Sequence, residues 1–345
     1  MRFLVLGGTR FLGRHLVDAA VERGHTVTTF TRGKSRTHEH PAVLPLGGDR
    51  DPTKGAGLAA LSSGEWDAAF DLSGYVPRVV DASCELLASR VRRYLFVSTL
   101  SVYSDTSRPG TTEDAPRTPL PNDPVTEDVT AHYGALKAAC EDRVVARYGP
   151  RATVVRPGLI VGPHDPTDRF PYWVARFTQP HVLGERDEEA AVPAPPERPI
   201  QIIDARDLAQ WMVMLAERDI AGTYNAVSPR GEFTMERLVD ALLQCAARDG
   251  VGPTPVWIEP DVLKKSGIEP WTELPLWLPD EPEYGGFFSV DDLRARETGL
   301  VARPLADTIA DTAAWLGGKW RPDAWQHVLS VERERRLVAV QADRG

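Results

Sequence analysis

The sequence predicts an α/β fold: a Rossmann-type doubly wound parallel sheet joined to a smaller, mostly helical C-terminal region. Over residues 1–160, short apolar runs alternate with helical stretches, which is typical of a parallel sheet covered on both faces. The first run, Phe3–Leu6, leads directly into a turn that contains Gly7, Gly8 and Gly13. A strand, a glycine-rich turn and a helix in this order form a site for nucleotide phosphates.

The elements of the sheet follow from local patterns. Apolar runs predict strands at Phe3–Leu6, Thr26–Thr31, Ala42–Leu46, Asp67–Leu72, Arg93–Ser98 and Ala152–Arg156. Helical spacing predicts helices over Leu12–Arg23, Arg78–Ser89 and Tyr133–Tyr148.

The pattern becomes irregular after residue 160. We expect one more strand and helix at Ile200–Ile203 and Asp204–Ala216, and a short final strand at Gly222–Asn225. Residues 178–199 are rich in Pro, Ala, Glu and Asp, which predicts an exposed or mobile loop.

These elements suggest two domains. Residues 1–165 would form the dinucleotide-binding domain, completed by about residues 200–228. The substrate-binding region would consist of about residues 166–199 and 229–345.

Composition and charge argue against several classes of protein. The chain has 345 residues, 42% of them hydrophobic, and a net charge of −9, which disfavours binding to nucleic acid. No apolar run approaches the roughly 18 residues of a membrane span, and no signal peptide is recognisable. The three cysteines form no metal-like pattern, so we expect reduced thiols and a cytoplasmic enzyme without a membrane partner.

A tyrosine and a lysine at helical spacing indicate the chemistry. Tyr133 and Lys137 are separated by four residues and lie on one face of the predicted helix. An ammonium group near a phenol favours the phenolate and lowers the phenol pKa. Tyr133 would then exchange a proton near neutral pH.

Together these motifs resemble the extended short-chain dehydrogenases/reductases, the NAD-dependent epimerase/dehydratase-like proteins. The resemblance spans essentially the whole chain and rests on the glycine turn, Asp71–Tyr75, Ser98–Tyr103, Tyr133–Lys137, Arg156–Pro163 and Ile202–Leu208. It implies hydride transfer, with Tyr133 as proton donor, Lys137 beside it, and Thr99 supplying the hydroxyl that orients the substrate. Ser98 and Ser101 are alternatives to Thr99, but we expect them to point away from the site or to cap the next turn.

Two arginines favour NADP(H) over NAD(H), although NAD(H) remains possible. The family's middle turn glycine is Arg10 here, whose side chain must project outward and could pair with a ribose phosphate. Arg32 follows the second strand where an acid would bind the ribose of NAD, and Lys34 adds charge. The alternative is that Arg32 and Lys34 only solvate a loop.

The remaining cofactor contacts are implied by the resemblance and by the strand ends. They are the turn residues Thr9, Phe11 and Leu12, the strand-end residues Asp49, Ser73 and Gly74, and Pro157, Leu159 and Ile160 near the nicotinamide. Asp49 could instead only cap a turn.

The substrate pocket is expected between the nucleotide domain and the C-terminal region. Its candidate wall residues are Tyr75, His132, His164, Tyr172, Trp173, Trp271, Glu273 and Trp277, each of which could instead pack in a core. The candidate basic groups for a diphosphate are Arg169, Arg176 and Arg198. Asp165 and Asp168 beside His164 resemble a metal cluster, but turn capping is the preferred interpretation, and we expect no metal.

Three functions remain open. The first is an NADPH-dependent reductase of a carbonyl or imine in a small molecule. The second is a nucleotide-sugar epimerase or dehydratase with tightly bound NAD, although Leu100-Ser101 replaces the acid–base pair of a dehydratase. The third is a non-catalytic NADP-binding or RNA-associated relative. The resemblance also implies a homodimer.

Overall fold

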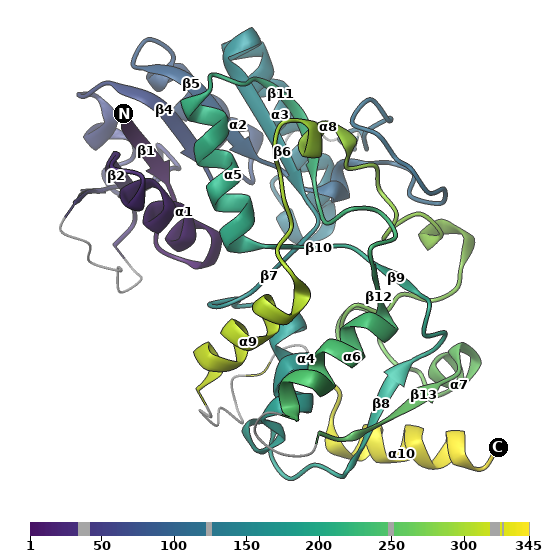
Figure 1. Cartoon of the computed structure of the whole chain (residues 1–345). Coiled ribbons are helices and arrows are strands. Elements are labelled where there is room, and N and C mark those ends of the chain that lie inside the picture. Colours follow the sequence, from purple (N-terminus) through teal and green to yellow (C-terminus); the bar gives the residue numbers. More distant parts are fainter. Residues whose placement is uncertain (34–41, 122–125, 248–251, 318–324, 326–327, 345) are drawn as a thin grey trace.

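The computed structural model describes residues 1–33, 42–121, 126–247, 252–317, 325 and 328–344. A layered part contains both the N-terminus and a large parallel sheet, and a second part below it contains the C-terminal helix (Figure 1). The chain passes between the two parts more than once, near β7 (Leu159–Val161) and β10 (Ile202–Asp204).

The large sheet is parallel and seven-stranded. Its order is β11-β6-β5-β4-β1-β2-β3, and every pairing within it is parallel. The bounds are β1 (Arg2–Leu6), β2 (Thr26–Thr31), β3 (Val43–Gly47), β4 (Trp66–Asp71), β5 (Val91–Val97), β6 (Ala152–Pro157) and β11 (Gly222–Ala226). Strand order reverses between β1 and β4, so a ligand crevice is expected beyond their carboxyl ends. The predicted fold class is confirmed.

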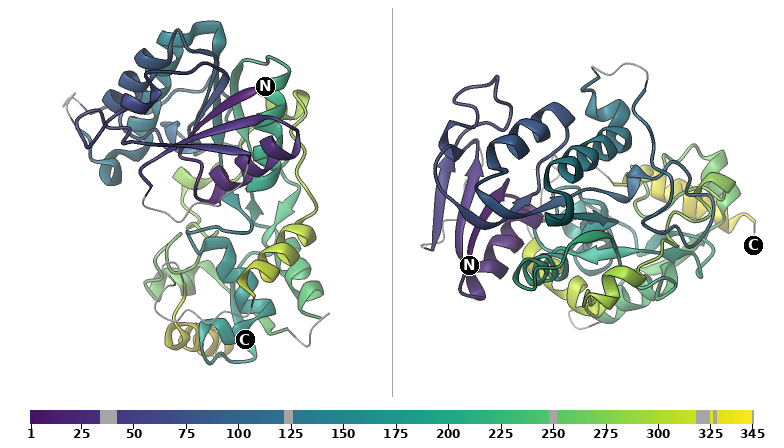
Figure 2. Two further views of the ribbon diagram at one scale, coloured as in Figure 1. Left: turned by 90° about the vertical axis from the view of Figure 1, so that its left-hand side faces the viewer. Right: turned by 90° about the horizontal axis from the view of Figure 1, so that it is seen from above.

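Helices cover both faces of this sheet (Figure 2). On one face α1 (Phe11–Glu22) packs against α5 (Ala205–Glu217), and on the other α2 (Pro77–Leu87) packs against α3 (Val129–Tyr148). Each pair buries its apolar stripe in a separate core, one on each side of the sheet.

Helix α3 begins four residues earlier than predicted. The Asp128 carboxylate accepts hydrogen bonds from the backbone N–H groups of Thr130 and Ala131 and therefore caps the helix. His132 has non-helical backbone angles. The first turn is consequently offset from the regular part of the helix that holds Tyr133.

The predicted strand Ile200–Ile203 is divided in two. Pro199–Ile200 (β9) pairs with β12 (Phe233–Thr234), whereas β10 pairs with β7. Between them, the Gln201 side chain donates to the carbonyls of Ser228 and Val290 and accepts from the Val290 N–H. These bonds hold the chain where it crosses between the two parts.

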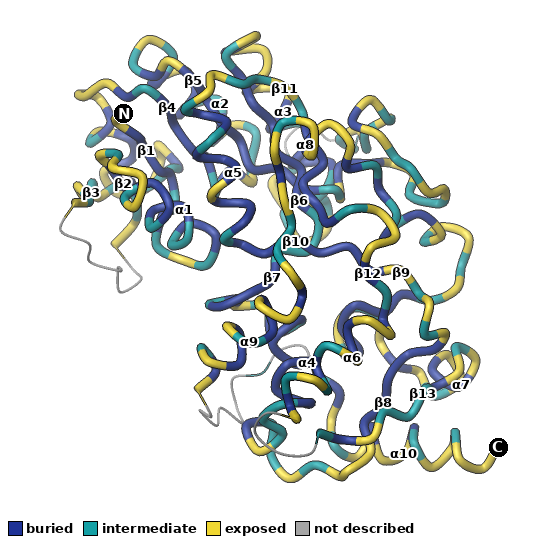
Figure 3. Tube along the Cα trace, in the orientation of Figure 1, coloured by how far each residue is buried: buried dark blue, intermediate teal, exposed yellow. Residues whose placement is uncertain are grey.

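The prediction of an exposed loop over residues 178–199 is wrong. Within it, β8 (Glu189–Pro193) pairs in parallel with β13 (Thr254–Ile258), and Ala190, Ala191 and Val192 are buried (Figure 3). Small apolar side chains give little hydrophobic signal, and the partner strand is distant in the sequence. Residues 178–199 therefore include a buried strand, Glu189–Pro193, and the charged residues beside it gave the segment the composition of a loop.

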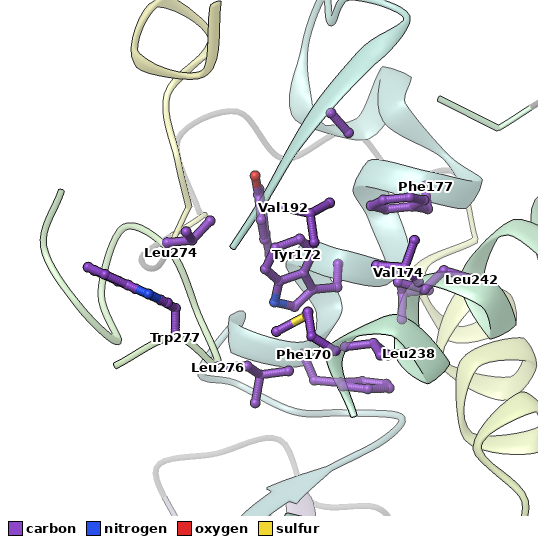
Figure 4. Close-up of a cluster of buried hydrophobic side chains, with 14 of the residues drawn as sticks. Phe170, Tyr172, Val174, Phe177, Val192, Leu238, Leu242, Leu274, Leu276 and Trp277 are labelled. Atoms are coloured by element: carbon purple, nitrogen blue, oxygen red, sulfur yellow. The ribbon is translucent and has the colours of Figure 1, made fainter. Parts of the chain in front are cut away.

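The second part is built mainly from helices around an aromatic core (Figure 4). Its helices are α4 (Arg169–Thr178), α6 (Met235–Ala246), α7 (Pro260–Lys265), α9 (Leu305–Leu316) and α10 (Val331–Ala342), while α8 (Leu293–Glu297) packs near β11. Short 3₁₀ turns complete the described elements at Ala59–Leu61, Leu100–Val102, Gly149–Arg151, Pro180–Leu183 and Pro282–Tyr284.

A buried ionic cluster fixes helix α10. The Glu334 carboxylate accepts from Arg176 at 2.9 Å and from Arg186 at 2.9 Å. Arg176 also donates to the backbone carbonyls of Asp187 and Glu189. These three side chains are almost completely buried, so the desolvation cost of each charge is offset only by its partners.

Candidate active site

The glycine turn leaves no space for side chains. Gly7 has φ +100°, which favours glycine. A Cβ on Gly13 would lie 2.5 Å from the Gly7 carbonyl oxygen, and one on Gly8 would lie 2.9 Å from Thr29 Cγ2. Helix α1 begins at Phe11, so its first N–H groups open beyond the carboxyl end of β1. Thr9 and Leu12 lie in this turn and the first helical turn, as expected.

Arginines follow the turn and the second strand. Arg10 is exposed, and its side chain makes no capping hydrogen bond to α1, consistent with the expected outward projection. Arg32 is exposed directly after β2. Lys34 lies outside the described residues.

The β1 and β4 strand ends meet as the topology requires. Ser73 Oγ donates to the Leu6 carbonyl, and a Cβ on Gly7 would lie 3.1 Å from Ser73. A Cβ on Gly74 would lie 2.6 Å from the Phe96 ring. Ser73 and Gly74 therefore border the glycine turn closely.

Other predicted cofactor residues lie at this edge of the sheet or just beyond it. Asp49 accepts a hydrogen bond from the Asp51 N–H at 3.0 Å, so it does cap a turn. Pro157 ends β6, and the half-buried Leu159 and Ile160 lie in β7. A role for these residues in cofactor binding stays a prediction.

A buried ion pair beneath the crevice was not predicted. The Arg50 guanidinium donates to both carboxylate oxygens of Asp71, and to the Ser83 hydroxyl at 2.7 Å. Asp71 is fully buried and also accepts from the Tyr94 hydroxyl at 2.8 Å. An acid at the end of one strand and an arginine after another could have signalled a pair at one sheet edge.

Thr99 and Tyr133 are brought together. Thr99 caps the turn Leu100–Val102 by accepting from the Ser101 N–H at 3.1 Å. Burial raises the pKa of the Tyr133 phenol, Tyr75 adds to the rise, and a hydrogen bond with Thr99 opposes it. The phenol remains partly exposed, with 37% of the residue accessible.

The two alternative serines differ in placement. The Thr99 hydroxyl donates to Ser101 Oγ at 3.2 Å, so Ser101 lies beside Thr99, and whether it points away from the bound substrate stays a prediction. Ser98 is buried, and its hydroxyl has no hydrogen-bond partner among the described residues.

Lys137 does not contact the Tyr133 phenol as predicted. Its buried ammonium donates to the carbonyls of Gly74 and Val97, each at 2.6 Å, and lies 4.2 Å from the Phe96 ring centroid. Desolvation lowers the pKa of Lys137 to about 8. The direction expected for Tyr133 is also wrong in this state, because burial dominates and raises the phenol pKa. Lys137 instead joins the ends of β4 and β5 beneath the site.

Gly134 lets α3 pack closely against the turn that follows Thr99. A Cβ at this position would lie 2.0 Å from the Ser101 carbonyl oxygen. Because this oxygen belongs to the backbone, the clash could be relieved only by moving the helix or the turn. We therefore expect Gly134→Ala to displace Tyr133 and to lower kcat at least about tenfold, because small misplacements at a reacting centre are costly. Gly149→Ala is the control, since nothing lies near its Cβ although its positive φ adds some strain. Equal kcat for the two variants would contradict the prediction.

The predicted substrate residues separate into two groups. Tyr75 is 43% exposed and its ring centroid lies 6.4 Å from that of Tyr133, while the half-buried His132 precedes Tyr133. The His164 ring contacts the rings of His15 and Trp315 in tilted and edge-on geometry. The half-buried Trp271 contacts Arg169.

Tyr172, Trp173 and Trp277 are core residues, so their assignment to the pocket wall is wrong for this structure. Their exposed fractions are 0%, 0% and 1%, and all three belong to the hydrophobic core of the second part. Figure 4 shows Tyr172 and Trp277 in this cluster. The apolar face of α4 explains this, because helical spacing of aromatic residues serves core packing as readily as ligand contact. Glu273 pairs with Arg333 at 3.1 Å.

The three arginines expected to bind a diphosphate differ in their ion pairs. Arg176 is buried against Glu334, and Arg198 pairs with Asp280 at 2.6 Å. Only Arg169 of the three makes no ion pair or hydrogen bond with a described residue.

Turn capping at Asp165 is confirmed. Its carboxylate accepts from both the backbone N–H and the hydroxyl of Thr167. In the described part of the chain, no three His, Cys, Asp or Glu side chains gather as a metal ion requires. No described helix combines the length and apolar character needed to cross a membrane.

A half-open cavity of about 270 Å³ lies in the second part. It is lined by residues from segments 195–199 and 278–288, among them Arg198, Leu278, Tyr284 and Phe288. None of the predicted catalytic or cofactor residues contributes to it.

Comparison with known proteins agrees with this geometry. A family model, the NAD-dependent epimerase/dehydratase family, matches residues 3–226. The chain belongs to this family. Membership places it among the NAD(P)-dependent enzymes of the short-chain dehydrogenase/reductase superfamily.

Two curated relatives match about half of this chain. The chloroplast stem-loop binding protein of 41 kDa b of Arabidopsis thaliana is 30% identical over 47% of this chain and 43% of its own. The 2-alkyl-3-oxoalkanoate reductase of Stenotrophomonas maltophilia is 33% identical over 48% of this chain and 52% of its own. The chain thus spans about half the length of the curated relatives it matches.

Solved structures show the fold over nearly the whole chain. The Bordetella bronchiseptica enzyme WbmH, determined in complex with NAD⁺, superposes with a TM-score of 0.65 at 18% identity, covering 92% of this chain and 98% of that one. At this identity the likeness concerns the fold alone.

The residues at the β1–β4 crevice fit a nicotinamide dinucleotide. The glycine turn lets a pyrophosphate approach the backbone, and exposed Arg10 and Arg32 could meet phosphate groups. Thr99, Tyr133 and Lys137 lie along the next strand end and helix.

Proposed function

We propose that the protein is an NADPH-dependent reductase of a carbonyl or imine group in a small molecule. The observation that supports it most is that Thr99 and the Tyr133 phenol interact where the end of β5 meets α3, the helix that also carries the buried ammonium of Lys137. The bound nicotinamide would supply the hydride. The similarity to a 2-alkyl-3-oxoalkanoate reductase supports the reductive direction.

Each of the three side chains has a distinct role in the proposed reaction. Thr99 Oγ1 donates to the carbonyl oxygen and holds it beside the phenol. Tyr133 gives its proton to that oxygen as negative charge develops there. Lys137, charged below its pKa of about 8, positions the Gly74 and Val97 carbonyls and would bind a ribose hydroxyl. Its ammonium is held by those carbonyls and not by the phenol, so its charge would act on the phenolate left on Tyr133 only through space.

The preference for NADPH rests on Arg32. This exposed guanidinium follows β2 where a ribose 2′-phosphate would lie. A charge-assisted hydrogen bond contributes about 1.5–3 kcal/mol, so we expect Arg32→Ala to weaken NADPH binding roughly 10- to 100-fold. NADH binding should change less than about twofold.

Fluorescence titration with both nucleotides measures this difference. Arg2→Ala, at the opposite end of β1 with its guanidinium 3.9 Å from Glu65, removes the same charge away from the crevice and should change neither affinity. Equal losses for NADPH and NADH in Arg32→Ala would show that Arg32 does not recognise the 2′-phosphate.

The second candidate is a nucleotide-sugar epimerase or dehydratase with tightly bound NAD, which the family match favours. Assay of the denatured protein for retained nucleotide distinguishes the two. Retained NAD supports this candidate, whereas nucleotide-free protein that binds NADPH selectively supports the reductase.

A third candidate is a non-catalytic NADP-binding or RNA-associated protein, favoured by the similarity to a stem-loop binding protein. The net charge of −9 opposes it. Tight RNA binding without turnover would support it.

We further propose that the chain forms a homodimer, with α3 at the interface. Val145 on this helix is 47% exposed although it is apolar. Sedimentation velocity measures the mass directly, and a monomer at micromolar concentration would contradict the proposal.

A further inference from the structure

Arg169 is a half-buried cation that forms no ion pair with a carboxylate of the described residues. Its Nε is inaccessible and has no hydrogen-bond partner, and no carboxylate of a described residue forms an ion pair with it. Desolvation lowers its pKa, with only a Coulombic contribution from Asp165 opposing the shift. Removing a charge from water is costly unless another group compensates it.

The guanidinium is held over an aromatic surface. Arg169 begins α4 and lies 5.5 Å from the Trp271 ring centroid, in the range of a cation–π contact. Trp271 in turn packs against Phe287 and Phe288, with ring centroids 5.6 and 5.9 Å away. This contact holds the guanidinium beside the indole ring, and none of its hydrogen-bond donors is used by a described residue.

A second polar group nearby is also unsatisfied. Asp165 is 1% exposed, and its Oδ2 has no hydrogen-bond partner, while its Oδ1 caps the Thr167 turn. Asp165 and Arg169 interact only through space. Other buried polar atoms of the described residues also lack a partner, but Arg169 differs in that no described carboxylate pairs with its charge. An oxyanion could satisfy Arg169, whereas Asp165 Oδ2 is an acceptor and would not bind one.

The surroundings define the ligand further. Phe288 contacts Trp271 and also lines the cavity of about 270 Å³, so the aromatic cluster of Trp271, Phe287 and Phe288 continues into that cavity. Leu278, Pro195 and Pro199 give the cavity apolar surface, and the carboxylates of Glu197, Asp280 and Glu281 also line it. Asp280 pairs with Arg198 and Glu281 with Lys264. An apolar body fits the cavity, and an oxyanion fits Arg169.

We propose that Arg169 and Trp271 form an oxyanion subsite, so that the reductase substrate is an apolar carbonyl compound carrying a carboxylate or phosphate. This inference rests on the proposed function. Arg169 binds the oxyanion with up to two parallel hydrogen bonds. The nearby negative charge of Asp165 lowers the affinity of Arg169 for the oxyanion. Arg169 is therefore a specificity-determining residue and takes no part in proton transfer.

Calorimetric titration with benzoate tests the subsite without cofactor or turnover, with benzyl alcohol as the neutral counterpart. We expect Arg169→Gln to weaken benzoate binding about tenfold or more and to leave benzyl alcohol unchanged. Arg169→Lys should retain part of the benzoate affinity. Arg336→Gln, an exposed arginine on α10, is the charge-matched control and should bind as the wild type.

Thermal denaturation separates recognition from a structural role. Because the variant removes an unpaired, desolvated charge, the Tm of Arg169→Gln should equal or exceed that of the wild type. A lower Tm, equal benzoate affinity in wild type and variant, or no benzoate binding to the wild type would overturn the proposal.

Two further measurements distinguish whether the oxyanion bound by Arg169 belongs to the substrate or to the nucleotide. NADPH affinity should be the same in wild type and Arg169→Gln; a parallel loss would assign the oxyanion to the nucleotide and overturn a substrate role. In turnover assays the kcat/KM ratio of 3-oxooctanoate to its methyl ester should fall about tenfold in the variant, and an unchanged ratio would also overturn it. If no carbonyl compound is reduced while benzoate still binds through Arg169, the reductase function fails and the anion site stands.

Discussion

Tyr133→Phe is expected to lower kcat by about 10²- to 10⁴-fold, the usual contribution of a positioned general acid. The substitution removes only the hydroxyl that bonds with Thr99 and leaves the ring in place. NADPH affinity should therefore remain within about twofold of the wild type, because the phenol would act on the substrate and not on the nucleotide phosphates.

The measurement is steady-state kinetics combined with nucleotide titration. Tyr224→Phe is the matched control, since that hydroxyl donates to the Ala221 carbonyl at the far edge of the sheet. An unaltered kcat in Tyr133→Phe would remove the phenol from the mechanism. A joint loss of kcat and NADPH affinity would indicate a displaced helix.

Asp71→Ala should have the largest effect on stability, a loss of about 3–5 kcal/mol in the free energy of unfolding. The substitution leaves the guanidinium of Arg50, whose side chain is 11% exposed, without its counter-charge. It also deprives the buried Tyr94 hydroxyl of its acceptor. Burial and the Asp71 charge already raise the pKa of Tyr94 well above its ordinary value, so the phenol stays neutral and needs that acceptor.

Urea denaturation measures the loss. Asp114→Ala removes a carboxylate from the exposed pair with Arg294, in which the side chains are 74% and 44% accessible, and should cost about 0–1 kcal/mol. Similar losses in the two variants would mean that the Arg50–Asp71 pair contributes no more than a surface pair.

Local sequence patterns were sufficient to predict the strands of the large sheet and the glycine turn. The strand Thr26–Thr31 has the predicted bounds, and the glycine turn lies where the order of strand, turn and helix requires. These features depend on residues adjacent in sequence. The predicted end of α3 at Tyr148 is confirmed, but its predicted start at Tyr133 was wrong because Asp128 caps the helix four residues earlier than expected.

Long-range contacts account for the other failures. The strand Glu189–Pro193 depends on Thr254–Ile258, and nothing within residues 178–199 reveals that partner. Trp173 carries the aromatic ring that a substrate wall would use, but its indole N–H donates to the Pro275 carbonyl inside the core. Residue type alone does not distinguish these two environments.

The candidate site was predictable where it depends on helical spacing and strand ends. Tyr133 and Thr99 meet because a helix and a strand end converge. The direction of the Tyr133 pKa shift could not be predicted, since it depends on burial and on where the Lys137 ammonium finds acceptors. Arg169 was one of three equivalent arginines in the sequence, and only the positions of Glu334 and Asp280 distinguish it from Arg176 and Arg198.

The Arg176–Arg186–Glu334 cluster has a consequence for biosynthesis. Arg176 and Glu334 are separated by 158 positions, so the ribosome makes both arginines long before their shared carboxylate. Until helix α10 leaves the exit tunnel, the nascent C-terminal part would have to enclose two uncompensated cations or remain open. Its core can therefore close only after Glu334 has been synthesised, whereas all strands of the large sheet are already synthesised by residue 226.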